Sequence, residues 1–93
     1  MLEKDIESYL REEVKKIGGK AYKFVSPGND GVPDRLVCLP GGEIYFVELK
    51  APGKKPSPLQ CKRIAELDLL GQCVFVLDST KAVDAFIEIV RGD

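Results

Sequence analysis

The ninety-three residues of the chain include no histidine. This absence excludes hydrolases built on a Ser-His-Asp triad, in which an imidazole is the general base. It equally excludes zinc enzymes that bind their metal through histidine and enzymes that use histidine as an acid or base. Acid-base chemistry in this chain must therefore come from carboxylates, lysine or metal-bound water.

Cysteine is scarce, and its spacing is uninformative for metal binding. The three cysteines are Cys38, Cys61 and Cys73, which are widely separated and form no C-x-x-C pair. An odd number at such spacing argues against a disulfide framework and against a structural zinc site. We expect all three to be reduced thiols in the core.

The sequence also lacks an apolar run long enough to span a membrane and a signal-peptide pattern, so we expect a cytoplasmic location. Apolar residues make up 44% and charged residues 31% of the chain, which is typical of a globular protein. A chain of this length can form one hydrophobic core, and we expect a single domain over residues 1–93.

The net charge of -1 hides a separation of charge along the chain. Residues 49–65 contain no acid and five cations, which are Lys50, Lys54, Lys55, Lys62 and Arg63. Residues 66–93 contain six acids and two cations. The basic stretch could attract phosphate groups, or it could be an ordinary solvated loop and helix face.

A hairpin is predicted at the centre of the chain. The apolar runs Leu36–Leu39 and Ile44–Val47 flank the turn Pro40–Glu43. If Leu39 faces Ile44, Asp34 lies opposite Leu49 and diagonal to Glu48 and Lys50. Two acids and a lysine then meet at the open end of the hairpin.

Charged groups on an apolar strand are costly to desolvate unless they are paired or bound to a metal. The simpler interpretation is a cross-strand ion pair between Lys50 and Asp34 or Glu48. The alternative is a hard cation held by the carboxylate oxygens, with the amine beside it to orient a water.

Hydrophobic periodicity and breakers predict the remaining elements. We expect a helix over 2–17, a strand over 21–25, a helix from 57 to about 70, a buried strand over 73–77 and a final helix beginning at Ser79 or Thr80. This order suggests an α/β fold in which helices cover a mixed sheet.

The motifs carry a family resemblance. Pro33-Asp34, followed after a hairpin by Glu48-Leu49-Lys50, resembles the PD-(D/E)xK signature of the restriction-endonuclease-like superfamily. The wider segments 31–35, 47–51 and 57–60 (GVPDR, VELKA and SPLQ) resemble the virus-type replication-repair nuclease (VRR-NUC) family over nearly the whole chain. The resemblance implies a restriction-endonuclease-like core with a mixed four-stranded sheet and the order αβββαβα.

The resemblance also implies a metal-dependent nuclease. Asp34, Glu48 and the Leu49 carbonyl would bind Mg²⁺ or Mn²⁺, and Lys50 would orient or deprotonate the attacking water. Glu3 matches a first-helix glutamate that helps to bind metal, although an acid in the first turn also stabilises a helix dipole. Gln60 matches an active-site residue that holds the water or the phosphate, although Ser57-x-x-Gln60 is also a capping box.

The resemblance further implies a DNA endonuclease of phage-like or DNA-repair type, with Lys54, Lys55, Lys62 and Arg63 as DNA-binding residues. Compact members resemble junction resolvases, so we predict a homodimer that cuts four-way (Holliday) junctions in a bacterial or phage-infected cell. The alternatives are a nuclease acting on flaps, ends or nicks, and an inactive nucleic-acid-binding or scaffolding module of the same fold.

Overall fold

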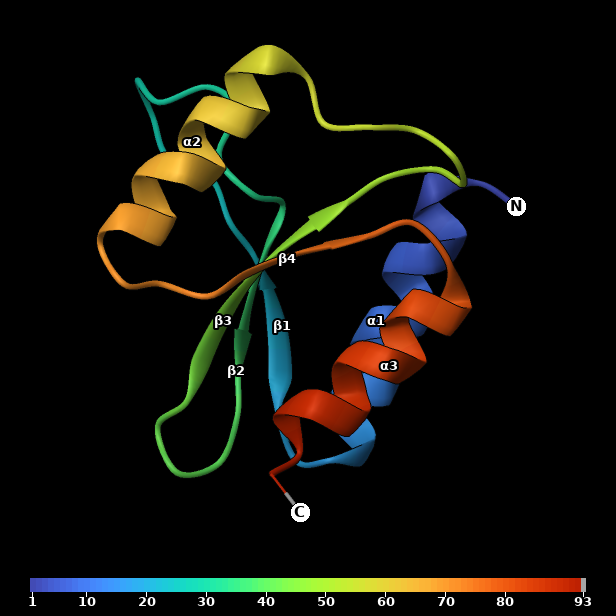
Figure 1. Ribbon diagram of the computed structural model, residues 1–93. Helices are drawn as coiled ribbons and strands as arrows, with labels where there is room; N and C mark the ends of the chain where they lie inside the picture. The colour runs from blue at the N-terminus through green and yellow to red at the C-terminus, as the bar shows by residue number, and fades with distance from the viewer. Residues whose placement is uncertain (93) are drawn as a thin grey trace.

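The computed structural model describes residues 1–92, which form a four-stranded mixed sheet and three helices (Figure 1). The strands are β1 (Lys20–Lys23), β2 (Arg35–Cys38), β3 (Ile44–Leu49) and β4 (Val74–Leu77), in that order across the sheet. The first three are antiparallel neighbours, and β4 runs parallel to β3. This arrangement confirms the predicted fold class.

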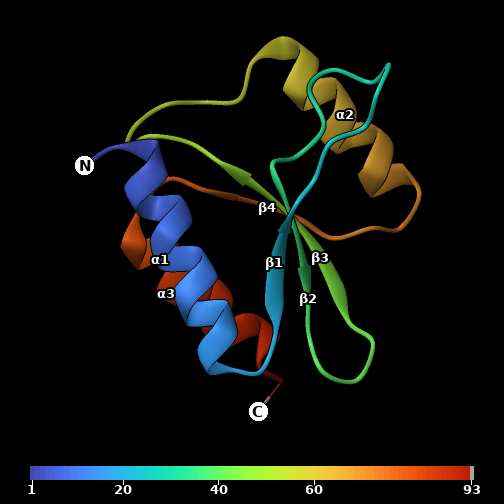
Figure 2. The ribbon, with the colours of Figure 1, turned by 180° about the vertical axis from the view of Figure 1, so that it is seen from behind.

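Helices α1 (Glu3–Lys16) and α3 (Thr80–Val90) lie together on one face of the sheet (Figures 1 and 2). Their apolar stripes provide much of the core, and Ile6, Leu10 and Val14 of α1 are fully buried. These residues recur every four positions, so they share one side of the helix. Burying each such side chain stabilises the fold by about 1.5–3 kcal/mol.

Helix α2 (Pro58–Leu69) lies on the other side of the sheet, beside the irregular segment 24–34 (Figures 1 and 2). None of its residues is fully buried. Gly31, with φ of +89°, packs so closely against it that an added Cβ would lie 2.9 Å from Leu59 Cγ. Only glycine fits this contact and this backbone conformation well, and the contact helps to position the segment that leads to Asp34.

The hairpin register differs by one residue from our prediction. Cys38, not Leu39, pairs with Ile44, and the Leu39 N–H donates to the Glu43 carbonyl at 2.8 Å. Gly41 and Gly42 both adopt positive φ, which closes a tighter turn than we assumed. Continuing this register by one residue places Asp34 directly opposite Glu48.

The predictions for the cysteines and for β4 were wrong about burial. Cys61 and Cys73 are exposed and Cys38 is half-buried, all as free thiols. Cys61 lies on α2, which packs loosely, and Cys73 precedes β4 at the edge of the sheet. The same edge position leaves Val76 41% exposed. Within residues 1–92, the helices are too short or too polar to cross a membrane.

Candidate active site

Glu48 is the one buried acid among residues 1–92. It lies near the end of β3, in register with Val76 of β4, and is only 1% exposed. Among the residues that the structure describes, neither of its carboxylate oxygens has a hydrogen-bond partner. A buried carboxylate without such partners is costly, so this arrangement needs a reason beyond packing.

Lys50 supplies partial compensation. Its Nζ lies 3.5 Å from Glu48 Oε2, which is an ion-pair distance, and its side chain is mostly buried. The Lys50 backbone N–H donates to the Leu77 carbonyl at 3.0 Å, which fixes the chain just beyond β3. The ion pair expected from the simpler interpretation is therefore present, but it does not satisfy the carboxylate.

Asp34 is held from both sides at the start of β2. Its Oδ2 accepts a hydrogen bond of 2.9 Å from the Leu49 N–H, and its carbonyl accepts one of 2.8 Å from the Phe24 N–H. The preceding Pro33 is fully buried and fixes the approach of the chain. The Asp34 side chain is thus oriented towards the end of β3, beside Glu48.

The closeness of the two acids changes the titration of Glu48. Burial, together with the negative charge of Asp34, raises the pKa of Glu48 from 4.5 to about 7, and Lys50 only partly opposes this shift. The protein alone therefore disfavours two ionised carboxylates here. A cation bound between them would reverse that preference.

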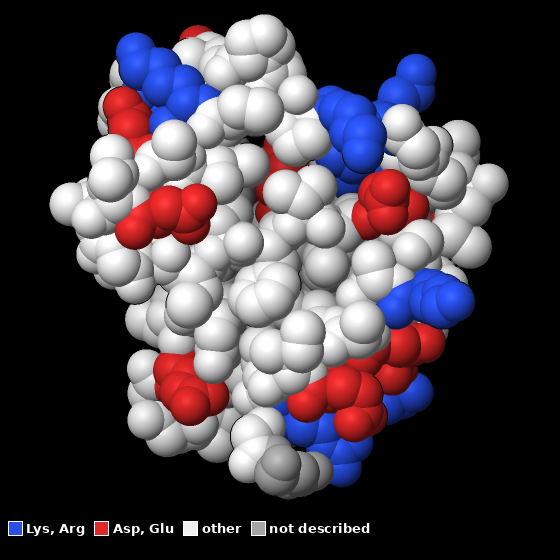
Figure 3. All heavy atoms as spheres, in the orientation of Figure 1, with Lys and Arg blue, Asp and Glu red and all other residues white. Residues whose placement is uncertain are grey.

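The donor set fits a hard divalent cation. Mg²⁺ accepts oxygen ligands, keeps several waters and usually takes one or two carboxylates from the protein. Asp34 and Glu48 supply two carboxylates, and the unpaired oxygens of Glu48 are those that a cation would satisfy. Figure 3 shows acidic atoms inside a hollow of the surface, with cationic side chains beside it.

Glu3 is not brought into this pair of acids. It is exposed in the first turn of α1, and residues 1–92 contain no group of three acidic or metal-binding side chains that could hold a metal. The N-terminal end of α1 does lie at the same end of the molecule as the segment after β3 (Figure 1). A metal-binding role for Glu3 stays a prediction.

Known proteins resemble this chain over most of its length. No family model matches the sequence. A protein named "Putative nuclease p44", from Acyrthosiphon pisum secondary endosymbiont phage 1, is 64% identical over 77 residues, which are 83% of each chain. A solved structure named "VRR_NUC domain" is 38% identical, with a TM-score of 0.88 over 95% of this chain and 96% of that chain.

The chain belongs to the VRR-NUC family. The solved VRR-NUC domain also confirms the restriction-endonuclease-like fold predicted from the sequence. Within that fold, the residues of the family motif fall at one end of the sheet, where Asp34, Glu48 and Lys50 meet.

Gln60 takes the helix-capping role that we left open for this VRR-NUC chain. Its Oε1 accepts a hydrogen bond of 2.8 Å from the Ser57 N–H, and Ser57 Oγ accepts one of 3.2 Å from the Gln60 N–H. Both halves of the capping box are therefore formed at the start of α2. A further role for Gln60 at the active site stays a prediction.

The predicted DNA-binding cations fall into two groups. Lys54 and Lys55 are exposed between β3 and α2, and Lys62 is exposed on α2. Arg63 is instead engaged within the protein, since its Nε donates to the Asp30 carbonyl at 2.9 Å and its Nη1 to Glu66 at 3.0 Å. Arg63 therefore ties segment 24–34 to α2.

Sequence reasoning missed the role of Arg35. Its Nε and Nη2 lie 3.1 and 3.0 Å from Oε2 of Glu7 on α1, and its Nη1 donates to the Ala21 carbonyl at 3.2 Å. These bonds fasten α1 to the sheet one residue after Asp34. The available signal was an arginine inside an apolar strand, which requires a partner when it is buried.

Proposed function

We propose that this VRR-NUC protein is a Mg²⁺- or Mn²⁺-dependent DNA endonuclease that hydrolyses phosphodiester bonds at the Asp34–Glu48 site. The observation that carries this proposal is the buried Glu48 carboxylate, which has no hydrogen bond within residues 1–92 and lies across the hairpin from Asp34. The nuclease name of the phage relative supports the same reaction.

The metal would be held by the carboxylates of Asp34 and Glu48 and by the carbonyl oxygen of Leu49. When bound, it would supply a Lewis acid that polarises the phosphate and acidifies a bound water. The Leu49 N–H keeps Asp34 in place by its bond to Oδ2. The ammonium group of Lys50, close to Glu48, would orient the attacking water and stabilise negative charge that develops on the phosphate oxygens.

We further propose that the protein acts as a homodimer on four-way junctions. A single small domain offers one active site, whereas two-fold pairing presents two sites to strands of a branched substrate. The exposed apolar surface around α2 and the sheet edge favours such pairing, because Leu69 is 89%, Leu70 75% and Val76 41% exposed. A dimer that covered these three side chains would remove exposed apolar surface from water.

The reaction is tested with labelled linear, flapped, forked and four-way DNA in Mg²⁺, in Mn²⁺ and in a chelator. We expect metal-dependent cleavage that is lost in Glu48→Gln and kept in the matched control Glu43→Gln, which changes an exposed acid at the other end of the same hairpin. Binding of DNA without metal-dependent cleavage would instead identify a binding module.

The assembly is tested by sedimentation at micromolar protein concentration. We expect a dimer that Leu69→Ser with Leu70→Ser converts to monomer, and both side chains are exposed enough for the fold to survive the change. A monomeric wild-type protein that cuts linear duplex and four-way DNA equally would contradict both the dimer and the junction preference.

A further inference from the structure

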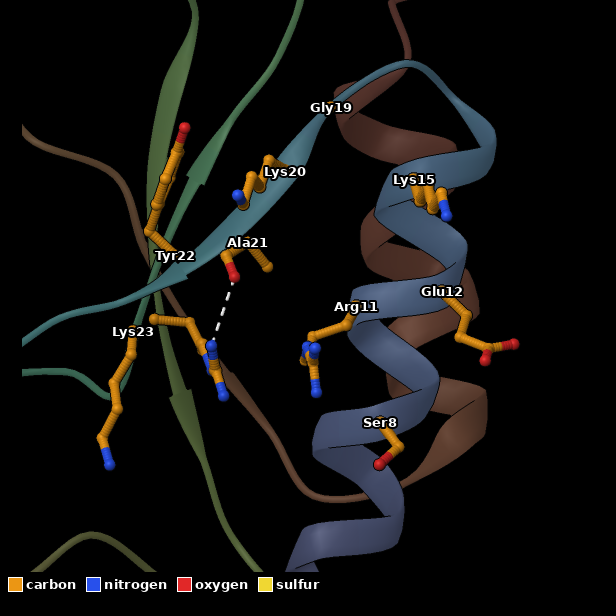
Figure 4. Close-up of a pocket in the computed structure, with 10 residues that line it drawn as sticks. Ser8, Arg11, Glu12, Lys15, Gly19, Lys20, Ala21, Tyr22 and Lys23 are labelled. Atoms are coloured by element: carbon orange, nitrogen blue, oxygen red, sulfur yellow. Dashed lines mark hydrogen bonds between the residues drawn. The ribbon is translucent and has the colours of Figure 1, made fainter.

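A second feature of the surface is an open cavity of about 640 Å³ between α1 and β1 (Figure 4). Its walls are strongly basic, since they include five cations, Arg11, Lys15, Lys20, Lys23 and Arg35, and one acid, Glu12. None of these cations belongs to the basic stretch after β3. We call this cavity the α1–β1 groove.

The charge in the α1–β1 groove is largely uncompensated. Arg35 is paired with Glu7, but within residues 1–92 Arg11, Lys15, Lys20 and Lys23 form no ion pair. The neighbouring Lys16, which lies outside the groove, is paired with Glu13 at 2.7 Å. Four cations of like sign in one cavity repel one another and favour an anionic partner with several charges.

The groove also has features that suit one strand of nucleic acid. Its volume lies within the range of about 300–1,000 Å³ typical of small-ligand sites, so a single strand can enter but a duplex can only present one backbone to it. β1 is an edge strand that pairs only with β2, so its other edge faces the groove. Tyr22 lines the same cavity and is 49% exposed, and the Lys20 ammonium group lies 4.8 Å from the centroid of its ring.

Arg35 links the groove to the proposed hydrolytic site along the chain. Lys23 pairs with Arg35 across β1 and β2, and Arg35 directly follows Asp34. The groove cations are distributed along β1 and α1, from Lys23 to Lys20 and Lys15 (Figure 4).

We propose that the α1–β1 groove is a second nucleic-acid contact, which binds the phosphodiester backbone of a single strand. The inference rests on the proposed function only in taking that strand to be DNA. The groove cations hold the backbone by charge.

The test compares two double variants that remove the same charge. The groove variant, Arg11→Gln with Lys15→Gln, removes two cations that line the groove. The control variant, Lys16→Gln with Lys81→Gln, removes two exposed cations outside it. Binding to labelled single-stranded and duplex DNA is measured over a range of salt concentrations without divalent metal. Circular dichroism verifies folding, and Lys15→Gln with Lys23→Gln replaces the first variant if that variant does not fold.

We expect the groove variant to bind single-stranded DNA about tenfold more weakly, with a salt slope smaller by about 1.4, because each lost phosphate contact removes about 0.7 from the slope. The control variant should change both quantities much less. Equal losses in the two variants, no loss in the groove variant, or a loss confined to duplex DNA would each overturn the proposal.

A cleavage assay keeps this result separate from the proposed function. At DNA concentrations below saturation the groove variant should cut more slowly because it binds more weakly, while Glu48→Gln should bind single strands normally and not cut. If the wild-type protein cuts no DNA, the proposed function fails, and the comparison of binding still decides the role of the groove.

Discussion

Arg35 and Glu48 are both largely buried charges on neighbouring strands, yet they are treated differently. Arg35 faces α1 and is bonded to Glu7 and to the Ala21 carbonyl. Glu48 faces the opposite side of the sheet, where Lys50 approaches to 3.5 Å and no hydrogen bond forms within residues 1–92. The fold can therefore satisfy a buried charge where the charge joins two elements, and it leaves one unsatisfied where the VRR-NUC motif lies.

The largest expected difference between substitutions of Glu48 and of Arg35 is in catalysis. Glu48→Gln, Asp34→Asn and Lys50→Ala should each abolish DNA cleavage, a loss of more than about a hundredfold, because they remove metal ligands or the charge beside them. The fold should survive, since the glutamine keeps the shape of Glu48. Single-turnover rates measure the loss, and near-normal turnover of Glu48→Gln would place the active site elsewhere.

Arg35 should behave in the opposite way, with a loss of stability rather than of chemistry. Arg35→Met removes three bonds and leaves Glu7 without its partner, which should lower the free energy of unfolding by about 2–3 kcal/mol. Urea unfolding measures this loss. Glu7→Gln with Arg35→Met gives the double-mutant cycle, and additive losses would show that the two side chains do not act as a pair.

The pH dependence of stability tests the contribution of the Glu48 carboxyl group. Because its pKa is raised in the folded protein, to about 7, Glu48 favours folding of the metal-free protein most below pH 4.5, and this contribution is lost as pH rises from 4.5 to 7. Glu48→Gln should remove that slope. Thermal unfolding between pH 4.5 and 8 measures it, and an unchanged slope in the variant would assign it to other groups.

Divalent metal should oppose the loss of stability that Glu48 causes as the pH rises. Mg²⁺ or Mn²⁺ binds the ionised carboxylates, so it should raise the melting temperature of the wild-type protein at pH 7.5 more than at pH 5. Glu48→Gln should respond much less, and Glu43→Gln should respond as the wild type does. An equal rise in all three proteins would indicate screening by the salt rather than a bound ion.

The sequence was informative wherever a local pattern determines the structure. The stripe of Ile6, Leu10 and Val14 predicted α1, and Gly18-Gly19 predicted its end. The register was not predictable, because it depends on how Gly41 and Gly42 share the turn. A shift of one residue then decided whether Asp34 faces Glu48 or Leu49.

Other features depend on how distant elements meet. The Arg35–Glu7 pair requires the rotation of α1 on the sheet, and the exposure of Cys61 requires the loose packing of α2, neither of which a linear pattern contains. The α1–β1 groove was hidden for a similar reason. Its cations are spread over a helix and two strands, with Glu12 and Glu13 between Arg11 and Lys15 in the sequence, so no basic run marks them.

Substitution of Gln60 should give the smallest effect. This residue lies on α2, on the face of the sheet where packing is weakest. Gln60→Ala opens one half of the capping box and Ser57→Ala opens the other, so each should lower the free energy of unfolding by about 1 kcal/mol. If capping is the whole role of Gln60, both variants should cleave DNA at the wild-type rate. A fall of more than about tenfold in Gln60→Ala alone, at the stability of Ser57→Ala, would require a direct contact with the water or the phosphate, because the two variants lose the same cap.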